Sequence, residues 1–244
     1  MSSSFVSPAR VVGLGLSLSL LLLAGPAAAA QKVPATVRVV TWQGKVLYDK
    51  KLKTGTTTVK TSGKADCLGG SPSNGRQTVP GATALGILQR ASQKAEQLRP
   101  LLLSDAFDFG LGLCGIGDSA ATGEQWWALK HNHASPSTGG EGTSLRKNDV
   151  VLWYLSESYN LPTPEELYLK APVKVKKKSP TRVRVFAYDD AGKRRPVAGA
   201  KVKGADSAPT NANGYTRVEL KKKTRLIARA SGLIPSNRVT VKVK

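Results

Sequence analysis

Three runs of sequence decide how this chain folds: FGLGLCGIG at Phe109–Gly117, EQWWALKHNH at Glu124–His133 and LRKNDVVLWYL at Leu145–Leu155. Together they hold one of the two cysteines, three of the four tryptophans and both histidines. Short apolar runs separated by glycine-rich turns are typical of β-strands that meet in a core. We therefore expect this stretch to form the centre of a small domain.

The sequence upstream supplies a hairpin and a helix. Residues 36–41 and 45–53 alternate apolar or β-branched with polar side chains on either side of a glycine turn, which predicts a β-hairpin. Residues 54–80 are rich in Gly, Ser, Thr and Lys without a period, which predicts a long loop. From Thr83 to Leu98, apolar side chains recur every three or four residues, which predicts one helix that Thr83 caps. Further strands are expected at residues 101–109, 111–116, 125–131 and 150–155.

Residues 1–30 are predicted to be a secretory signal peptide. A basic start, an apolar run over residues 11–23 and a small-residue segment ending in Ala27–Ala30 precede Gln31. The apolar run is short for a membrane span, so no stable span is expected after cleavage. The expected location is therefore secreted or extracellular, including association with the cell wall.

Export bears on the two cysteines. In an oxidising compartment, Cys67 and Cys114 most simply form one disulfide, which would pin the long loop. In the chain-entropy model, a disulfide that closes a loop of this length stabilises the folded state by about 4 kcal/mol. The other interpretation, a catalytic thiol, is disfavoured because secreted free thiols rarely stay reduced.

Several spaced blocks over residues 35–158 resemble a known family. The blocks are Cys67–Gly69, Gly81–Leu85, Phe109–Gly117, Trp126–His133 and Asp149–Tyr154. They resemble an uncharacterised family of secreted bacterial domains that is similar to the C-terminal domain of transcobalamin. That resemblance implies a β-grasp fold, a mixed sheet curled around one helix, for residues 31–160. It also implies binding of a corrinoid, although the large helical partner domain of transcobalamin is absent from this sequence.

The rest of the chain predicts a second domain. Residues 161–180 are rich in Pro and Lys and are expected to be a linker, although residues 166–169 could add an edge strand to the first domain. Residues 181–244 alternate apolar and polar in several short runs, which predicts a β-sandwich. Pro196–Val202, Thr210–Tyr215 and Leu226–Ala230 resemble carboxypeptidase-regulatory, transthyretin-like domains of Ig-like fold, which usually act as surface or spacer modules. The expected fold class is therefore α+β: a β-grasp domain plus a small all-β Ig-like sandwich.

The formal net charge is +21, and nearly all of it falls in the last third of the chain. A positive electrostatic field of this kind attracts polyanions. The alternative interpretation is that the charged face only keeps the protein soluble. For a secreted protein, anionic cell-wall polymers, acidic polysaccharides and phospholipid head groups are the expected partners. Few aromatic residues interleave the lysines, which argues against nucleic acid. The candidate anion-binding residues are Arg182, Arg184, Arg194, Arg195, Lys201, Lys203, Lys221, Lys222, Lys223 and Lys242.

A ligand site is also predicted near the tryptophans. Trp126 and Trp127 are neighbours on a strand, so their rings must face opposite sides. Trp127 and Trp153 are expected in the core, and Trp126 near the surface, where it could stack on a sugar or a planar cofactor beside Asn132 and His133. On a strand, His131 and His133 would point to the same face, as metal ligands can. The favoured interpretation is that they are polar residues at the end of a strand, and no metal or cofactor is predicted.

No catalytic motif is recognised. Asp105, Asp108, Asp118 and Glu124 lie near apolar segments without a recognised pairing, and no nucleophile elbow, P-loop or HExxH motif occurs. The leading hypothesis is a non-enzymatic, secreted cell-envelope binding or adhesion protein that recognises an anionic surface polymer or an unknown ligand. The alternative is a carrier of a cobalamin-like small molecule, and the third hypothesis is a hydrolase whose site cannot be placed.

Overall fold

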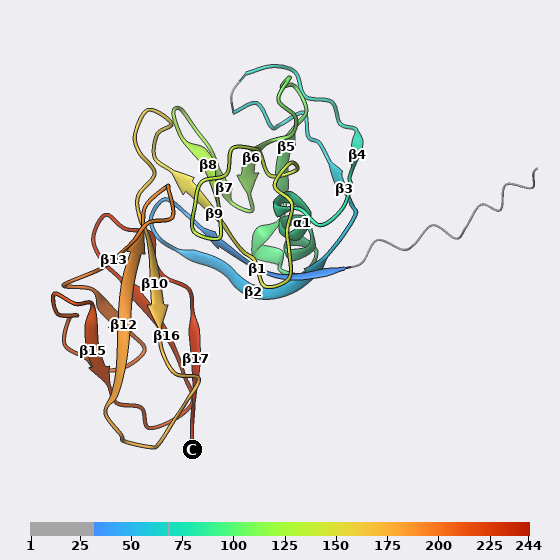
Figure 1. Cartoon of the computed structure of the whole chain (residues 1–244). Helices are drawn as coiled ribbons and strands as arrows, with labels where there is room; N and C mark the ends of the chain where they lie inside the picture. Colours follow the sequence, from blue (N-terminus) through green and yellow to red (C-terminus); the bar gives the residue numbers. More distant parts are fainter. Residues whose placement is uncertain (1–31, 68) are drawn as a thin grey trace, which may run out of the picture.

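The computed structural model describes residues 32–67 and 69–244, and it contains two hydrophobic cores (Figure 1). The first core gathers residues between Ala35 and Leu155, and the second gathers residues between Leu167 and Val241. We refer to residues 32–158 as the N-terminal part and to residues 165–244 as the C-terminal part. The expected signal peptide, residues 1–30, lies outside the described residues. Within the described ranges, every helix is too short or too polar to cross a membrane.

A four-stranded sheet forms the base of the N-terminal part. Its strands are β1 (Val33–Val40), β2 (Val46–Thr54), β8 (Trp126–His131) and β9 (Val150–Ser156), in the order β2-β1-β9-β8. β1 and β2 pair antiparallel, which confirms the predicted hairpin, and β1 runs parallel to β9. The alternation of β1 explains its placement, because Val37 and Val39 face the first core while Arg38 faces the other side.

β9 lies inside the sheet and is buried on both faces. Val151, Trp153 and Leu155 belong to the first core. On the opposite face, Leu152 and Tyr154 pack with Ile234 of the C-terminal part, in a small third cluster. A strand covered on both sides requires an uninterrupted apolar run, and this is the reason for the sequence VVLWYL.

One α-helix, α1 (Ala84–Lys94), packs on the first core through Leu85, Leu88 and Ala91. The Thr83 side chain accepts a hydrogen bond from the Gly86 N–H at 3.0 Å, which confirms the predicted cap. The helix is shorter than predicted because Ala95 is extended, and a 3₁₀ turn, η1 (Glu96–Leu98), completes the segment.

Short strands surround the helix. β3 (Thr57–Lys60) pairs with β4 (Arg76–Val79), and β5 (Leu101–Ser104), β6 (Gly112–Ile116) and β7 (Ser119–Ala120) form a three-stranded sheet. The predicted disulfide between Cys67 and Cys114 is present, with the two Cα atoms 5.4 Å apart. It links the segment after β3 to β6. The segment expected to be one long loop therefore contains a hairpin, whose Val59 and Val79 are buried in the first core.

The C-terminal part consists of two four-stranded sheets on either side of the second core. One sheet holds β10 (Glu166–Lys170), β12 (Thr181–Tyr188), β13 (Arg194–Pro196) and β15 (Tyr215–Val218). The other holds β11 (Lys174–Val175), β14 (Lys201–Lys203), β16 (Thr224–Arg229) and β17 (Val239–Val243). β10 and β11 lie in the expected linker, and β10 pairs with β12, not with the N-terminal part.

The predicted α+β class, a β-grasp domain plus an Ig-like sandwich, is wrong as a description of the whole. The described residues contain 17 β-strands against one α-helix of 11 residues, so the protein is mostly β. The prediction counted residues 54–80 as a loop and residues 161–180 as a linker, in which it allowed only an edge strand at residues 166–169 on the first domain. Both segments instead form strands, because β-branched and apolar residues in them alternate well enough to cover the two cores.

Candidate functional site

The outer face of β12 carries a row of cationic and aromatic side chains. Val183, Val185 and Ala187 point into the second core. Because side chains alternate along a strand, Arg182, Arg184 and Phe186 point to the opposite face. The strand therefore places two guanidinium groups and an aromatic ring in one line on this face of the C-terminal part, where the Phe186 ring is covered by its neighbours and only 4% exposed.

Neighbouring strands extend this row into a ladder. Tyr215 of β15 lies directly opposite Arg184, and Arg194 of β13 lies opposite Tyr188, one step from Phe186. The guanidinium carbon of Arg194 lies 4.4 Å from the centre of the Phe186 ring. The guanidinium carbon of Arg184 lies 4.5 Å from the centre of the same ring. The remaining distances are 4.6 Å from Arg184 to Tyr215 and 4.7 Å from Arg182 to Tyr215. We call Arg194, Phe186, Arg184, Tyr215 and Arg182, in this order, the arginine ladder.

Stacking on rings fixes the planes of the guanidinium groups without neutralising them. Contacts within about 6 Å of a ring centre are attractive. In the described part of the chain, none of the three ladder arginines forms an ion pair with a carboxylate. Arg184 Nε donates a hydrogen bond to the carbonyl oxygen of Asn213 at 3.0 Å, which further restricts that side chain.

The ladder borders a shallow hollow of about 430 Å³. Lys170 joins the three ladder arginines along its wall, and no acidic side chain is among the described residues that line it. Guanidinium groups bind carboxylate and phosphate oxygens through two parallel hydrogen bonds, and they give up water more readily than an ammonium group does. The hollow is therefore built to accept anionic groups.

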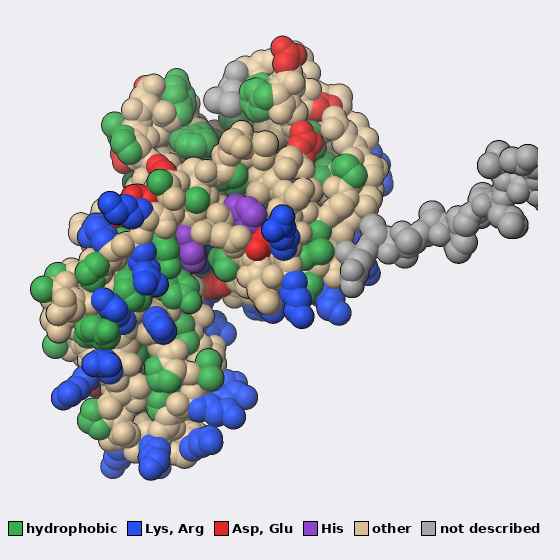
Figure 2. All heavy atoms as spheres, viewed as in Figure 1, with side chains coloured by type: hydrophobic (Ala, Val, Ile, Leu, Met, Phe, Trp, Pro, Cys, Tyr) green, Lys and Arg blue, Asp and Glu red, His purple; other side chains and the backbone are tan. Residues whose placement is uncertain are grey.

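The structure separates the ten predicted anion-binding residues. Arg182, Arg184 and Arg194 come together in the ladder. Arg195 instead pairs with Glu165. Lys201, Lys203 and Lys242 lie on the second sheet, and Lys221–Lys223 lie in the turn between β15 and β16. Figure 2 shows Lys and Arg side chains spread over the visible face of the C-terminal part rather than in one patch.

Phe186 and Tyr215 were not among the predicted anion-binding residues. The sequence does indicate the position of Phe186, because it follows Arg182 and Arg184 at every second residue and so lies on the same face of the strand. Tyr215 is distant in sequence, and its place opposite Arg184 depends on the register of β15 against β12. Gly214, at φ +75°, helps to set that register, since a Cβ there would lie 2.3 Å from the carbonyl oxygen of Val185.

The predicted ligand-binding group of Trp126, Asn132 and His133 is not brought together. Trp126 begins β8, whereas Asn132 and His133 follow its other end, with left-handed φ angles of 51° and 74°. The Asn132 side chain donates to Asp149 at 2.9 Å and accepts from the Val150 N–H at 2.9 Å. His133 stacks on Tyr188 with ring centres 4.1 Å apart. Asn132 and His133 are therefore engaged in contacts within the protein.

The two histidines also separate from each other. His131 Nε2 donates to the Asp149 carboxylate at 2.7 Å. Burial by itself raises the pKa of Asp149, but hydrogen bonds from the Arg146 N–H, Asn132 and His131 outweigh it and hold the pKa below its ordinary value. His133 instead reaches Glu166, in the C-terminal part. Among the described residues, no three His, Cys, Asp or Glu side chains gather as metal ligands would.

Buried charges join the two parts of the chain. Arg38 of β1, 2% exposed, forms an ion pair with Glu166 of β10, 1% exposed, and His133 Nδ1 donates to the same carboxylate at 3.0 Å. Lys130 of β8 lies 2.9 Å from Asp190 Oδ1. Burial alone raises the pKa of Glu166, but the charge of Arg38 and the hydrogen bond from His133 keep it below its ordinary value. Figure 2 shows histidine side chains at this junction.

The acidic residues considered for catalysis have local partners or lie exposed. Asp105 accepts hydrogen bonds from the Ser73 N–H at 2.7 Å and from the Ser73 hydroxyl at 2.5 Å. Glu124 accepts one from the Ser158 hydroxyl at 2.6 Å. Asp108 and Asp118 are exposed. Asp105 and Glu124 thus connect loops to neighbouring segments.

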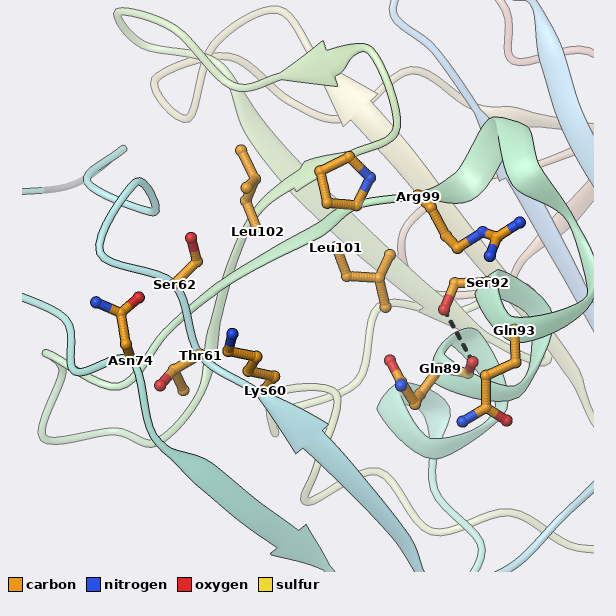
Figure 3. Close-up of a pocket in the computed structure, with 11 residues that line it drawn as sticks. Lys60, Thr61, Ser62, Asn74, Gln89, Ser92, Gln93, Arg99, Leu101 and Leu102 are labelled. Carbon is orange, nitrogen blue, oxygen red and sulfur yellow. Dashed lines mark hydrogen bonds between the residues drawn. The ribbon is translucent and has the colours of Figure 1, made fainter.

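A second hollow, of about 470 Å³, lies beside α1 (Figure 3). Ser62 and Asn74 lie on one side of it, and Gln93 and Arg99 lie on the other. The Arg99 guanidinium points away from Ser62 and Asn74, and the Ser92 hydroxyl donates to the carbonyl oxygen of Gln89 at 2.9 Å. Its polar groups do not converge on one point, so the ladder is the stronger candidate site.

No protein-family model and no curated protein matches this chain. The resemblances to the transcobalamin C-terminal domain and to transthyretin-like domains therefore stay predictions.

Proposed function

We propose that this protein is a non-enzymatic, exported binding protein that attaches to an anionic polymer of the cell envelope through its C-terminal part. The single observation that carries the proposal is the arginine ladder, in which three guanidinium groups without a carboxylate partner among the described residues line one hollow. The disulfide fits an oxidising compartment, where such polymers occur.

The shared chemistry of the proposed ligand is a repeated carboxylate or phosphate. A polymer suits the ladder better than a small anion, because its three cations are lined up along one face. The remaining positive charge attracts the same polymer at longer range, and salt weakens that attraction.

Binding to immobilised polygalacturonate and to immobilised polyphosphate tests the proposal and distinguishes carboxylate from phosphate. Replacement of Arg182, Arg184 and Arg194 together by Ala is expected to weaken binding at least about tenfold, since one lost charge-assisted hydrogen bond costs about 1.5–3 kcal/mol. The matched control replaces Lys221, Lys222 and Lys223 by Ala. It removes the same charge from exposed side chains outside the ladder.

The outcome separates a site from a general field. If the lysine variant loses as much affinity as the arginine variant, total charge explains the binding and the ladder proposal fails. Replacement of the three arginines by Lys keeps the charge but removes the two-pronged hydrogen bonding. We expect this variant to bind closer to the Ala variant than to the original protein.

A further inference from the structure

A separate hollow of about 370 Å³ opens between β6, β8 and the loop at residues 135–140. It lies at the lower end of the size range of ligand pockets, about 300–1,000 Å³. Phe109, Leu111, Trp126, Trp127 and Trp153 form much of its wall. Figure 2 shows the N-terminal part hollowed between two protruding segments, with hydrophobic side chains inside.

The wall of this hollow is uncharged. Its polar members are neutral, among them Gln125, Ser135, Ser137 and Thr138. No Asp, Glu, Lys, Arg or His occurs among the described residues that line it, although the chain carries a net charge of +21. A charged ligand would find no counter-charge there, so the chemistry of the wall selects a neutral one.

Two hydrogen-bond donors in the wall lack acceptors. The indole N–H groups of Trp126 and Trp127 are buried, and neither has a partner among the described residues. Trp127 is 4% exposed, whereas Trp126 is half-buried. A buried donor without a partner costs about 1–3 kcal/mol. Both indole nitrogens are closed off from solvent, so a molecule in the hollow would meet the indole rings and not their N–H groups. By contrast, Trp153 Nε1 donates to the carbonyl oxygen of Ala84 at 3.4 Å.

An exposed aromatic ring stands at the rim. Phe109 is 72% exposed, and its ring stacks on Phe107 with centres 4.9 Å apart and planes 6° apart. Phe107 in turn lies against Gly112, where an added Cβ would come within 2.3 Å of its ring. One face of the Phe109 ring thus packs on Phe107 while the other face stays in solvent. The exposed face is a flat apolar surface on which a ligand can stack.

We propose that this hollow binds a neutral sugar unit of a glycan. A sugar ring has an apolar face that can stack on Trp126 or Phe109. The hydroxyl groups of Ser135, Ser137 and Thr138 can serve its remaining oxygens and hydroxyls. The inference goes beyond the anionic-polymer proposal and does not depend on it, because the two sites share no residue.

Calorimetric titration of the full chain with three neutral trisaccharides tests it: maltotriose, cellotriose and the N-acetylglucosamine trimer, each up to about 10 mM. At least one is expected to bind. Trp126→Ala and Phe109→Ala are each expected to weaken that binding at least about tenfold, as loss of a stacking anchor does. Phe109 is exposed, so its variant tests the site without threatening the fold.

Trp42→Ala is the matched control, since Trp42 is 46% exposed and does not line the hollow. Its affinity for the trisaccharide should stay that of the original protein. Absence of binding by all three sugars overturns the proposal, as does an equal loss in the Trp42 variant. If the sugars do not bind but the uncharged apolar dye Nile red does, and the Phe109 variant loses that binding, the hollow is a site for apolar molecules. This result would also overturn the proposal. The arginine-ladder variants should bind the trisaccharide unchanged, which keeps this test separate from that of the anionic polymer.

Discussion

Replacement of Glu166 by Gln should destabilise the protein severely, although it changes only one atom of the side chain. Glu166 is 1% exposed and faces Arg38, 2% exposed, and His133 across the junction between the two parts. The Gln side chain fills the same space but carries no charge, so the Arg38 guanidinium stays buried without a counter-charge. Loss of one partner from a buried ion pair costs about 3–5 kcal/mol, and we expect a loss in that range.

The neighbouring residue supplies a control of identical chemistry. Glu165 pairs with Arg195, but the Arg195 side chain is 54% exposed. Exposed pairs contribute about 0–1 kcal/mol, so Glu165→Gln should cost less than about 1 kcal/mol. Urea unfolding measures both variants, and tryptophan fluorescence is a suitable signal because all four tryptophans lie in the N-terminal part. Equal losses in the two variants would refute the argument from burial.

The pH dependence gives a second check on the same pair. The folded pKa of Glu166 lies below its unfolded value, so its ionised form stabilises the fold above the unfolded pKa of about 4.3, and this stabilisation is lost as the pH falls through the folded pKa. The difference between the original protein and Glu166→Gln should therefore shrink below about pH 4. A difference that stays constant down to pH 2 would show that charge on Glu166 is not its source.

Two further changes probe the N-terminal part. Replacement of Cys67 and Cys114 together by Ser should lower the free energy of unfolding by about 2–5 kcal/mol, since the unfolded chain then loses its cross-link; urea unfolding measures this, and a change below 1 kcal/mol would contradict it. Thr83→Ala removes the cap of α1 and should cost about 1 kcal/mol, whereas Thr83→Ser, which keeps the hydroxyl, should cost less; equal losses would show that the cap hydrogen bond is not responsible.

The sequence was informative where one strand or one covalent link determines the outcome. The hairpin of β1 and β2, the cap at Thr83, the buried run of β9 and the disulfide follow from local pattern, and all are present. Trp127 and Trp153 lie in the core as expected. The hairpin, the cap and the buried run are each encoded within a few residues, and the disulfide was predictable because the chain has only two cysteines.

The features that failed or were missed depend on pairing between distant segments. The sequence allowed an edge strand at residues 166–169 but assigned it to the first domain, because nothing in that segment states that it pairs with β12. Trp126, Asn132 and His133 were grouped as one ligand site, but Trp126 begins β8, whereas Asn132 and His133 follow its other end with left-handed backbone. The stacking of Tyr215 on two arginines required the register of β15. Single-sequence patterns carry no information on such registers.

The junction and the arginine ladder occupy two ends of one strand face, and this decides how the ladder must be tested. Tyr188 continues the parity of Arg182, Arg184 and Phe186 on β12, and it is covered by the ring of His133 from the N-terminal part. The other end of the same face stays open and forms the hollow at the ladder. Deletion of the C-terminal part would remove the ladder, but it would also uncover Leu152 and Tyr154 and leave Arg38 without Glu166. Loss of polymer binding after such a deletion could follow from a damaged N-terminal part, and so only substitutions within the ladder can assign the binding to its guanidinium groups.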